Sequence, residues 1–250
     1  MTMKHRINIR QVVVPALVLL ALGCPGRVAA QGDYDLFREG AGSASLLYRG
    51  HKAYEYNLLF NGTFYWSSPV FAMGEVVYNG KAYQGILLNI DAARQDLIAK
   101  VGGGIASKVL DREYVRECSF NGSRYLNLQY IYGDQSPFGY WKVLYDGRAK
   151  VLKCVTKRLE QDLDGRKRSE TNFEGNYRSD VYQTFVYSEA YCYLSDDGRI
   201  IPVKRRRDVL RLFDKPTRRD IRRHIRHQEG SGMLPFERYF TEVIQYVESR

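Results

Sequence analysis

The side chains best able to act on a ligand form a basic run near the C-terminal end of the chain. Between residues 199 and 228 there are twelve lysines and arginines against three aspartates, a local balance of +9. Five of the arginines recur at helical spacing and would share one face of a helix: Arg218, Arg219, Arg222, Arg223 and Arg226. Such a face attracts the phosphates of nucleic acid or of anionic lipid head groups, although a charge run is also typical of a solvated surface.

Two patterns resemble metal sites and then depart from them. Residues 160–165 place carboxylates at the first, third and fifth positions of a calcium loop, but Lys167 and Thr171 stand where an apolar residue and a bidentate glutamate belong. His224 and His227 are three residues apart on a predicted helix, yet no carboxylate ligand accompanies them. We therefore expect no metal and no cofactor.

Catalytic patterns are also missing from the sequence. The chain has only four histidines, and neither a Gly-x-Ser-x-Gly elbow nor a phosphate-binding loop occurs. We interpret Cys118, Cys154 and Cys192 as buried thiols, with one disulfide and one free thiol as the alternative. Hydrolysis by paired carboxylates stays open because it leaves no local signature. It would need two carboxylates about 5–10 Å apart in an aromatic-lined cleft.

Aromatic residues gather in two short stretches, around residues 60–71 and 138–141. Exposed aromatic rings could stack on sugars or line an apolar cavity, whereas buried ones would form the core of a sheet. The candidates for ligand contact are Phe64, Tyr65, Trp66 and Trp141.

A β-rich body must position these side chains. Residues 75–90 indicate two strands joined at Asn79-Gly80, a pair that accepts the positive φ angles of a tight hairpin turn. Five further pairs of this kind recur along the chain: Asn61-Gly62, Asn121-Gly122, Asp146-Gly147, Asp164-Gly165 and Asp197-Gly198. The pattern predicts a mainly β fold, an antiparallel sandwich or a curved, partly open barrel built from hairpins.

Between these corners, β-branched and aromatic runs predict the strands. Their expected ranges are 46–48, 52–60, 63–66, 75–90 around its turn, 96–101, 113–120, 124–132, 140–145, 148–157, 181–194 and 200–203. Residues 91–95 would be a polar link, and the highly charged residues 159–178 an exposed excursion between two strands.

After Lys204 the hydrophobic period changes from two to about 3.6 residues, which indicates helices. We expect one helix over 208–213, a second from Pro216 and a third from Pro235, whose apolar stripe includes Phe236 and Phe240. The predicted domains are therefore a β domain over 31–205 and a C-terminal helical segment over 206–250 packed on it.

The first 30 residues read as a signal peptide. Basic residues precede an apolar stretch over 12–22, which is too short to span a bilayer comfortably, and small residues lead to a cleavage site after Ala30. Lipidation at Cys24 is the alternative, on a motif that is out of register by one position. Cleavage would remove four basic residues and lower the formal net charge from +10 to +6.

The chain resembles a family of exported, uncharacterised β-rich proteins of the Bacteroidota. The resemblance is carried by Val-Tyr-Asn-Gly-Lys-Ala-Tyr at 77–83, Ile-Leu-Leu-Asn-Ile-Asp at 86–91, Tyr-Asp-Gly at 145–147 and Tyr-Cys-Tyr-Leu at 191–194. It continues through the tail from Phe213 to Tyr246, where the arginine-rich helix departs from the family pattern. The resemblance implies export and a β-rich fold, and it carries no assigned activity or catalytic residue.

From these observations we expect a non-enzymatic envelope protein, located in the periplasm, on the outer membrane or outside the cell. It would bind an amphiphilic or apolar ligand or an outer-membrane partner. The alternatives are an envelope glycan hydrolase with paired carboxylates and a scaffold that docks on anionic surfaces through the basic helix. In that case the partner would be an anionic membrane surface or another envelope protein, because export argues against nucleic acid. The sequence leaves the oligomeric state open.

Overall fold

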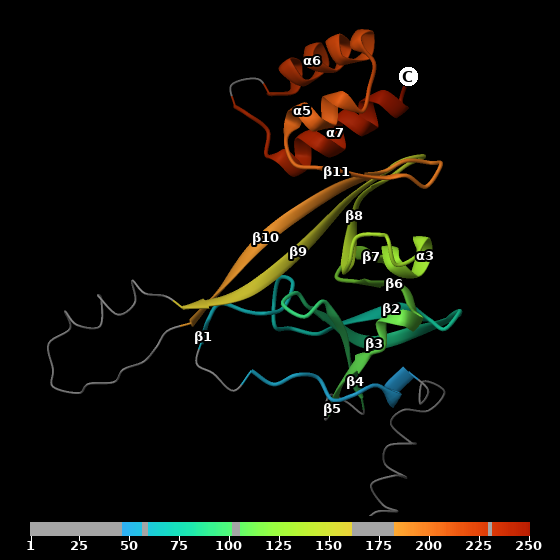
Figure 1. The fold of residues 1–250 in the computed structure, drawn as a ribbon, viewed down its shortest axis with the longest axis vertical. Coiled ribbons are helices and arrows are strands. Elements are labelled where there is room, and N and C mark those ends of the chain that lie inside the picture. The colour runs from blue at the N-terminus through green and yellow to red at the C-terminus, as the bar shows by residue number, and fades with distance from the viewer. Residues whose placement is uncertain (1–46, 57–59, 102–105, 162–182, 230–231) are drawn as a thin grey trace, which may run out of the picture.

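The structure is a computed structural model that describes residues 47–56, 60–101, 106–161, 183–229 and 232–250. It shows a twisted β body with helices packed at one end (Figure 1). The predicted signal peptide over 1–30 and most of the charged excursion over 159–178 lie outside the described residues.

Eleven strands of the described chain form one sheet. They are β1 (Phe60–Asn61), β2 (Ala72–Tyr78), β3 (Lys81–Asp91), β4 (Asp96–Val101), β5 (Ala106–Leu110), β6 (Val115–Phe120), β7 (Ser123–Asn127), β8 (Tyr140–Asp146), β9 (Lys150–Gln161), β10 (Gln183–Leu194) and β11 (Ile200–Val203). The helical elements are the 3₁₀ turns η3 (Leu47–Arg49) and η5 (Arg112–Tyr114) and the helices α3 (Leu128–Tyr132), α5 (Arg206–Arg211), α6 (Lys215–Glu229) and α7 (Phe236–Glu248).

The strands follow the order β1-β10-β9-β8-β7-β6-β2-β3-β4-β5, and β11 also pairs with β10. Neighbouring strands are antiparallel, except that β1 and β10 run parallel. Since the path ends in β1 and β5, the sheet is open. The predicted fold class, a mainly antiparallel β protein with C-terminal helices, is confirmed.

Two hairpins turn at the Asn-Gly pairs as predicted. Asn79 and Gly80 have φ angles of 47° and 74°, and Asn121 and Gly122 have φ angles of 50° and 65°. Two successive residues with positive φ define the type I′ turn, whose twist matches that of the strands it joins. These corners explain why β2 pairs with β3 and β6 with β7.

The remaining Asn-Gly and Asp-Gly pairs do not all form hairpin turns. Asp146 ends β8 and Gly147 begins its connection to β9, and Asp197-Gly198 lies in the connection between β10 and β11, as expected of hairpins. Asn61-Gly62 forms no hairpin, because β1 ends there after pairing in parallel with β10. Asp164-Gly165 lies outside the described residues.

Four of the predicted strands, over 46–48, 52–60, 63–66 and 124–132, were wrong wholly or in part. Leu47–Arg49 is a 3₁₀ turn, and among the described residues of 52–66 the strand is limited to Phe60–Asn61. The strand expected over 124–132 ends at Asn127, whose side chain accepts a hydrogen bond from the backbone N–H of Tyr130. This cap starts helix α3 and overrides the β propensity of the tyrosines that follow.

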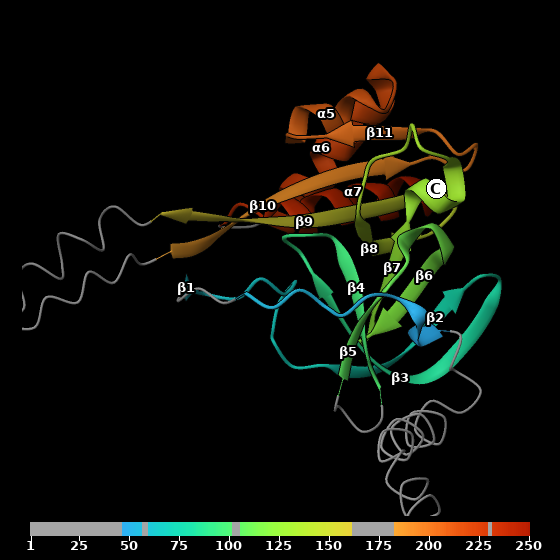
Figure 2. The ribbon, with the colours of Figure 1, turned by 60° about the horizontal axis from the view of Figure 1, so that its bottom comes forward.

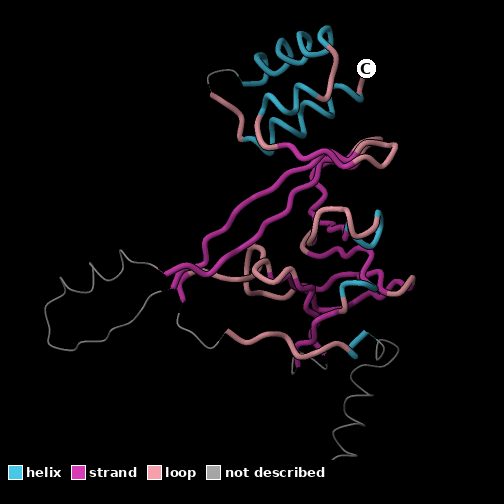
Figure 3. The backbone as a smooth tube through the Cα atoms, viewed as in Figure 1, coloured by secondary structure: helices cyan, strands magenta, loops and turns pink. Residues whose placement is uncertain are grey.

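The helices lie in two layers over one end of the sheet. Helix α7 buries Tyr239, Phe240, Val243 and Ile244, and it packs on β8 and β9, whereas α6 packs on α7 through Ile221 and Ile225. In Figures 1 and 3, α6 lies farthest from the sheet, with α5 and α7 between. The outer side of α6 is therefore a free surface of the described protein.

The β body has its own core, and β9 and β10 connect it to the helices. The sheet residues Leu88, Leu97 and Tyr140 belong to one cluster of fully buried side chains. Figure 2 shows β9 and β10 side by side as a long ribbon that extends beyond the helices. A second cluster, including Cys154 and Cys192, fills the space where this ribbon meets β7 and β8.

The polar link expected between β3 and β4 buries two of its polar side chains, Asp91 and Gln95. Asp91 is 1% exposed, and its carboxylate accepts hydrogen bonds from the backbone N–H groups of Ala93 and Arg94 and from the Tyr56 hydroxyl at 2.9 Å. Burial raises the pKa of Asp91 above its ordinary value. The turn thus carries an acidic group that is satisfied within the protein.

Gln95 connects this turn to two other strands. Its side chain is 3% exposed, and Nε2 donates to the carbonyls of Ala92 at 2.8 Å and Val155 at 2.9 Å. Its Oε1 accepts from the backbone N–H of Tyr140 at 3.2 Å. A Cβ on Gly139 would clash with this oxygen, and Gly139 has a φ of 98°. The Gln95 amide therefore occupies space that exists because residue 139 is a glycine.

Candidate functional site

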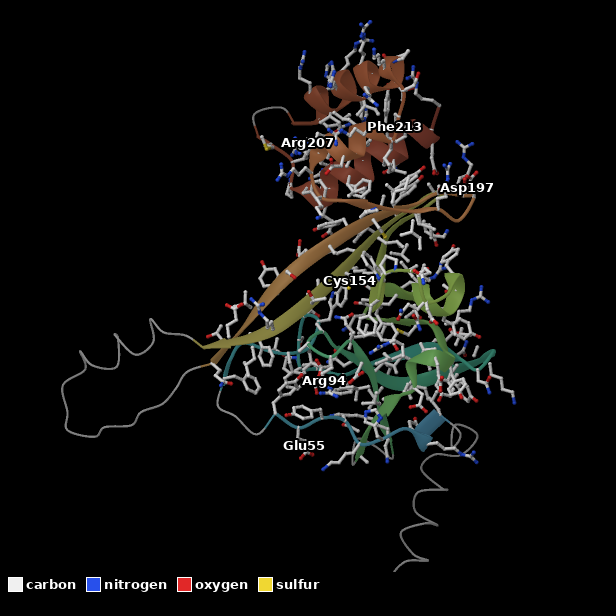
Figure 4. All side chains as sticks on the ribbon, in the orientation of Figure 1. Glu55, Arg94, Cys154, Asp197, Arg207 and Phe213 are labelled. Carbon is white, nitrogen blue, oxygen red and sulfur yellow. The ribbon has the colours of Figure 1, made fainter. Side chains whose placement is uncertain are left out.

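The outer side of α6 is a continuous basic stripe. Four of the five predicted arginines are exposed there, together with the lysine that starts the helix: Lys215, Arg219, Arg222, Arg223 and Arg226. At 100° per residue these five positions fall within an arc of about 100°, and they span about 17 Å along the helix axis. We call this set the α6 basic stripe. Figure 4 shows nitrogen-tipped side chains extending outward from α6.

The fifth predicted arginine has a different role. Arg218 is partly buried, and its Nε donates to the carbonyls of Leu210 and Phe213 at 2.8 Å each. These carbonyls lie at the C-terminal end of α5, where a helix leaves acceptors without an intrahelical donor. Arg218 therefore holds the α5–α6 connection together, and the structure separates it from the basic stripe.

Acidic residues stand beside the stripe and not within it. Asp220 accepts a hydrogen bond from Arg250 at 2.7 Å, which lowers the pKa of its carboxyl group, and it lies 3.7 Å from Arg223. Among the described residues, Arg219, Arg222 and Arg226 take part in no ion pair. Their charge is therefore available to an external anion.

The inner side of α6 is fixed to α7 by both apolar and polar contacts. Ile221 is 0% exposed and Ile225 is 5% exposed in the shared core. His224 Nε2 lies 2.7 Å from Glu242 Oε1, and its ring stacks on Tyr246 with the ring centroids 4.0 Å apart. These contacts set the rotation of α6 about its own axis and hold the basic stripe toward solvent.

The candidate aromatic residues mainly contact other aromatic rings. Phe64 and Tyr65 lie in a cluster with Tyr56, at centroid distances of 4.2 Å for Tyr56–Phe64 and for Phe64–Tyr65. Trp66 packs edge-to-face on Tyr125. Trp141 is 5% exposed, and its Nε1 donates to the Phe138 carbonyl. Phe64, Tyr65 and Trp66 are partly buried and Trp141 is buried, and each side chain is already packed on other groups of the β body.

The three cysteines of the described chain are all buried and free. Burial raises the pKa of the Cys154 and Cys192 thiols to about 12 and moves that of Cys118 upward as well. A thiol with a raised pKa is a poor nucleophile. The interpretation as buried thiols is confirmed.

A groove of about 580 Å³ lies between the β10–β11 hairpin and α5. Its apolar lining includes Tyr193, Ile201 and Leu212, and its charged lining includes Asp197 and Asp208. Figure 4 labels Asp197 at the tip of this hairpin.

Both of these carboxylates already have local partners. Asp197 accepts a hydrogen bond from the Ser195 hydroxyl and pairs with Arg199 at 2.7 Å, and these contacts lower the pKa of its carboxyl group. Asp208 accepts from the backbone N–H of Arg205 at 3.0 Å and thereby caps α5. A general acid needs a raised pKa and that of Asp197 is lowered, so Asp197 lends no support to paired-carboxylate hydrolysis.

A polar cluster that sequence reasoning missed lies where β9 meets the residues around Tyr65. The Lys157 ammonium group donates to the carbonyls of Thr63, at 2.7 Å, and Tyr65. Burial lowers its pKa, and the nearby Asp91 carboxylate opposes that shift. Perturbed groups can mark functional sites, but here the contacts are with the backbone of adjacent segments and serve packing.

The last helix closes on the β8–β9 turn through one carboxylate. Glu248 accepts hydrogen bonds from the Tyr145 hydroxyl at 3.0 Å and from the backbone N–H groups of Arg148 at 3.0 Å and Ala149 at 2.7 Å. Burial acts to raise its pKa, but these hydrogen bonds outweigh burial and lower it below the ordinary value of 4.5. This contact anchors the C-terminal end of α7.

We expect Glu248→Gln to lower the free energy of unfolding by about 1 kcal/mol at neutral pH, the size of a partly solvated charge-assisted hydrogen bond. Because the folded-state pKa is depressed, this stabilisation is present above the ordinary pKa of 4.5 and is lost as the pH falls through the lower folded value. Urea unfolding of wild type and variant over a pH series measures it. Glu55→Gln, at an exposed ion pair with Lys52, is the control with little effect. A gap between wild type and Glu248→Gln that widens as the pH falls would contradict this assignment.

The described residues were also compared with the requirements of a metal site and of a membrane-spanning helix. Among the described residues, no group of three or more histidines, cysteines, aspartates or glutamates is arranged to bind a metal ion. None of the described helices is both long enough and apolar enough to cross a membrane.

Comparison of the chain with protein-family models, curated proteins and solved structures finds no match. The resemblance to exported proteins of the Bacteroidota and the predicted signal peptide therefore stay predictions. What can be said of function depends on the geometry of the described residues.

Proposed function

We propose that this protein is a non-enzymatic docking module that binds anionic membrane surfaces through the α6 basic stripe. One observation carries the proposal. Five basic side chains lie on the outermost arc of the outermost helix, and no acidic side chain lies within that arc. A flat surface can approach this side of α6 because α7 lies on the opposite side.

The size of the expected attraction is sufficient for docking. A lysine or arginine near an anionic leaflet contributes about 1 kcal/mol. Five such groups would contribute about 5 kcal/mol, or between three and four orders of magnitude in partition coefficient. Their spread over about 17 Å lets all of them reach head groups of one leaflet at the same time.

A membrane fits the stripe better than the other anionic partners. Export, as the sequence predicts it, would separate the protein from nucleic acid. An acidic partner protein would need carboxylates that match a straight line of charge, whereas the lipids of a fluid leaflet can rearrange beneath it. We propose with it that the protein is located in the cell envelope and acts there as a scaffold.

Co-sedimentation with lipid vesicles tests the proposal. The protein should sediment with vesicles that contain phosphatidylglycerol and stay in solution with vesicles of phosphatidylcholine alone. At an ionic strength of about 1 M, where the Debye length falls to about 3 Å, it should be released. Equal binding to both kinds of vesicle, or binding that ignores salt, would contradict a charge-based mechanism.

The groove beside α5 supports a second candidate function, the binding of a small amphiphilic ligand. Its volume of about 580 Å³ is in the range of ligand pockets, and its lining combines apolar and charged side chains. Native mass spectrometry of protein purified from its own cells should then show a bound molecule that Leu212→Trp displaces. Protein of the bare polypeptide mass alone would contradict this second function.

A further inference from the structure

Strand β10 has an edge that is paired at both ends and open in the middle. On one side, β9 pairs with all twelve of its residues. On the other side, β1 pairs with Gln183 and Thr184, and β11 pairs with residues 191–194. No described strand or loop pairs with the six residues between, 185–190. Figure 1 shows the same stretch of β10 with no ribbon along its outer edge.

The contacts of β9 show which backbone groups face this open edge. The N–H of Lys157 donates to Ala92, and the carbonyl of Val155 accepts from Gln95, so odd-numbered residues of β9 face away from β10. The even-numbered residues of β9 therefore pair with β10, and their register partners on β10 are also even-numbered.

It follows that the odd-numbered residues of β10 direct their backbone groups to the other side. Pro202 agrees with this assignment, since it has no N–H to donate and stands opposite Cys192, an even-numbered residue. The N–H and C=O groups of Tyr187 and Glu189 thus point out of the sheet along the open stretch.

Apart from the charge of Glu189, the open stretch has none of the usual protection. It contains no proline, glycine or lysine, and Val186 and Tyr187 are 46% and 64% exposed. At the far end of the sheet, by contrast, residues 51–53 cover the edge of β5 through hydrogen bonds from Ala53 to Ser107 and from Val109 to His51. Unprotected edges are templates for pairing with another chain.

We propose that the open stretch of β10 binds a short extended segment of a partner polypeptide by β-strand addition. Its six residues offer a slot of about 20 Å, at about 3.4 Å per residue. Strands β1 and β11 close both ends, so an occupant must enter and leave within this length. The twelve-residue β10 of a second copy would collide with both strands, which excludes edge-to-edge pairing of two copies.

The side chains beside the slot define the chemistry of the partner. On one face, Val186, Ser188 and Ala190 form a small, mainly apolar row. On the other face, Tyr187 is followed by Glu189, whose carboxylate already lies 2.8 Å from the Lys153 ammonium group. The slot therefore fits a strand in which β-branched apolar residues alternate with polar ones.

A synthetic peptide, Thr-Val-Lys-Val-Lys-Val-Thr, is the probe for a first test with the full chain. We expect it to bind and to slow amide hydrogen exchange at Tyr187 and Glu189, two positions that exchange fast in the free protein. The same peptide with its three central backbone nitrogens methylated should bind at least tenfold more weakly, because it cannot complete the ladder. Equal affinity for the two peptides would overturn the proposal, and so would slow exchange at Tyr187 and Glu189 before any peptide is added.

Variants of the protein give an independent test. Tyr187→Pro removes an N–H that faces the slot and none that pairs with β9, so it should keep the fold and weaken peptide binding at least tenfold. Tyr187→Ala keeps the backbone donor and should bind within about threefold of wild type. Retained binding by a folded Tyr187→Pro protein would contradict the proposal, as would a dimer of the wild type that this variant abolishes. Should Tyr187→Pro fail to fold, the comparison of the two peptides still decides.

Discussion

Replacing Arg219, Arg222, Arg223 and Arg226 by glutamine should lower the partition coefficient onto phosphatidylglycerol vesicles roughly a thousandfold. Each arginine near the leaflet contributes about 1 kcal/mol, so four of them account for about three orders of magnitude. The fold should not change, because these side chains are exposed and glutamine is a good helix former. Vesicle co-sedimentation over a range of lipid concentrations measures the effect.

A variant with the same loss of charge elsewhere is the matched control. It carries glutamine at four exposed basic positions of the β body: Lys52, Lys81, Arg116 and Arg158. If the position of the charge matters, this variant should bind within about tenfold of wild type. Equal losses in the two quadruple variants would show that only net charge acts, and that α6 is not the docking site.

Gln95→Leu should lower the free energy of unfolding by about 3–5 kcal/mol, the largest effect on stability that we expect from one substitution. The side chain amide satisfies the buried Val155 carbonyl and the buried Tyr140 N–H, and leucine would leave both without that partner. An orphaned buried polar group costs about 1–3 kcal/mol. Leucine would also place a methyl group against Gly139, where the amide oxygen of Gln95 now lies.

Urea unfolding of Gln95→Leu and of a surface control separates burial from residue type. Gln84→Leu makes the same chemical change at an exposed position, and it should alter the free energy of unfolding by less than about 0.5 kcal/mol. If the free energy of unfolding falls by the same small amount in both variants, the Gln95 side chain does not hold the β3–β4 turn to β8 and β9.

Some of this architecture could be predicted because its cause is local. Asn79-Gly80 and Asn121-Gly122 turn the chain by their own φ preferences, whatever lies around them. The apolar stripe of α7 follows from a helical period within thirteen residues, and Phe240 and Val243 are buried as that period indicates. In both cases the signal and the structure it specifies lie in the same short stretch.

The rest depends on residues far apart in the chain. Residues 91–95 were predicted only as a polar link, because nothing local shows that Gln95 will donate a hydrogen bond to Val155 of β9, sixty residues later. Arg218 lies one helical turn before Arg222 and was predicted on the same face. Its Nε instead donates to carbonyls at the end of α5. The open edge of β10 is defined by where β1 and β11 stop pairing, and no local pattern marks it.

Arginine-selective labelling with mass mapping tests the central claim most directly, because it shows which face touches the membrane. Protein bound to phosphatidylglycerol vesicles should lose labelling at Arg219, Arg222 and Arg226 relative to free protein, while Arg116 and Arg158 react as before. Unchanged labelling on α6, together with protection of the arginines on the β body, would contradict docking through the basic stripe.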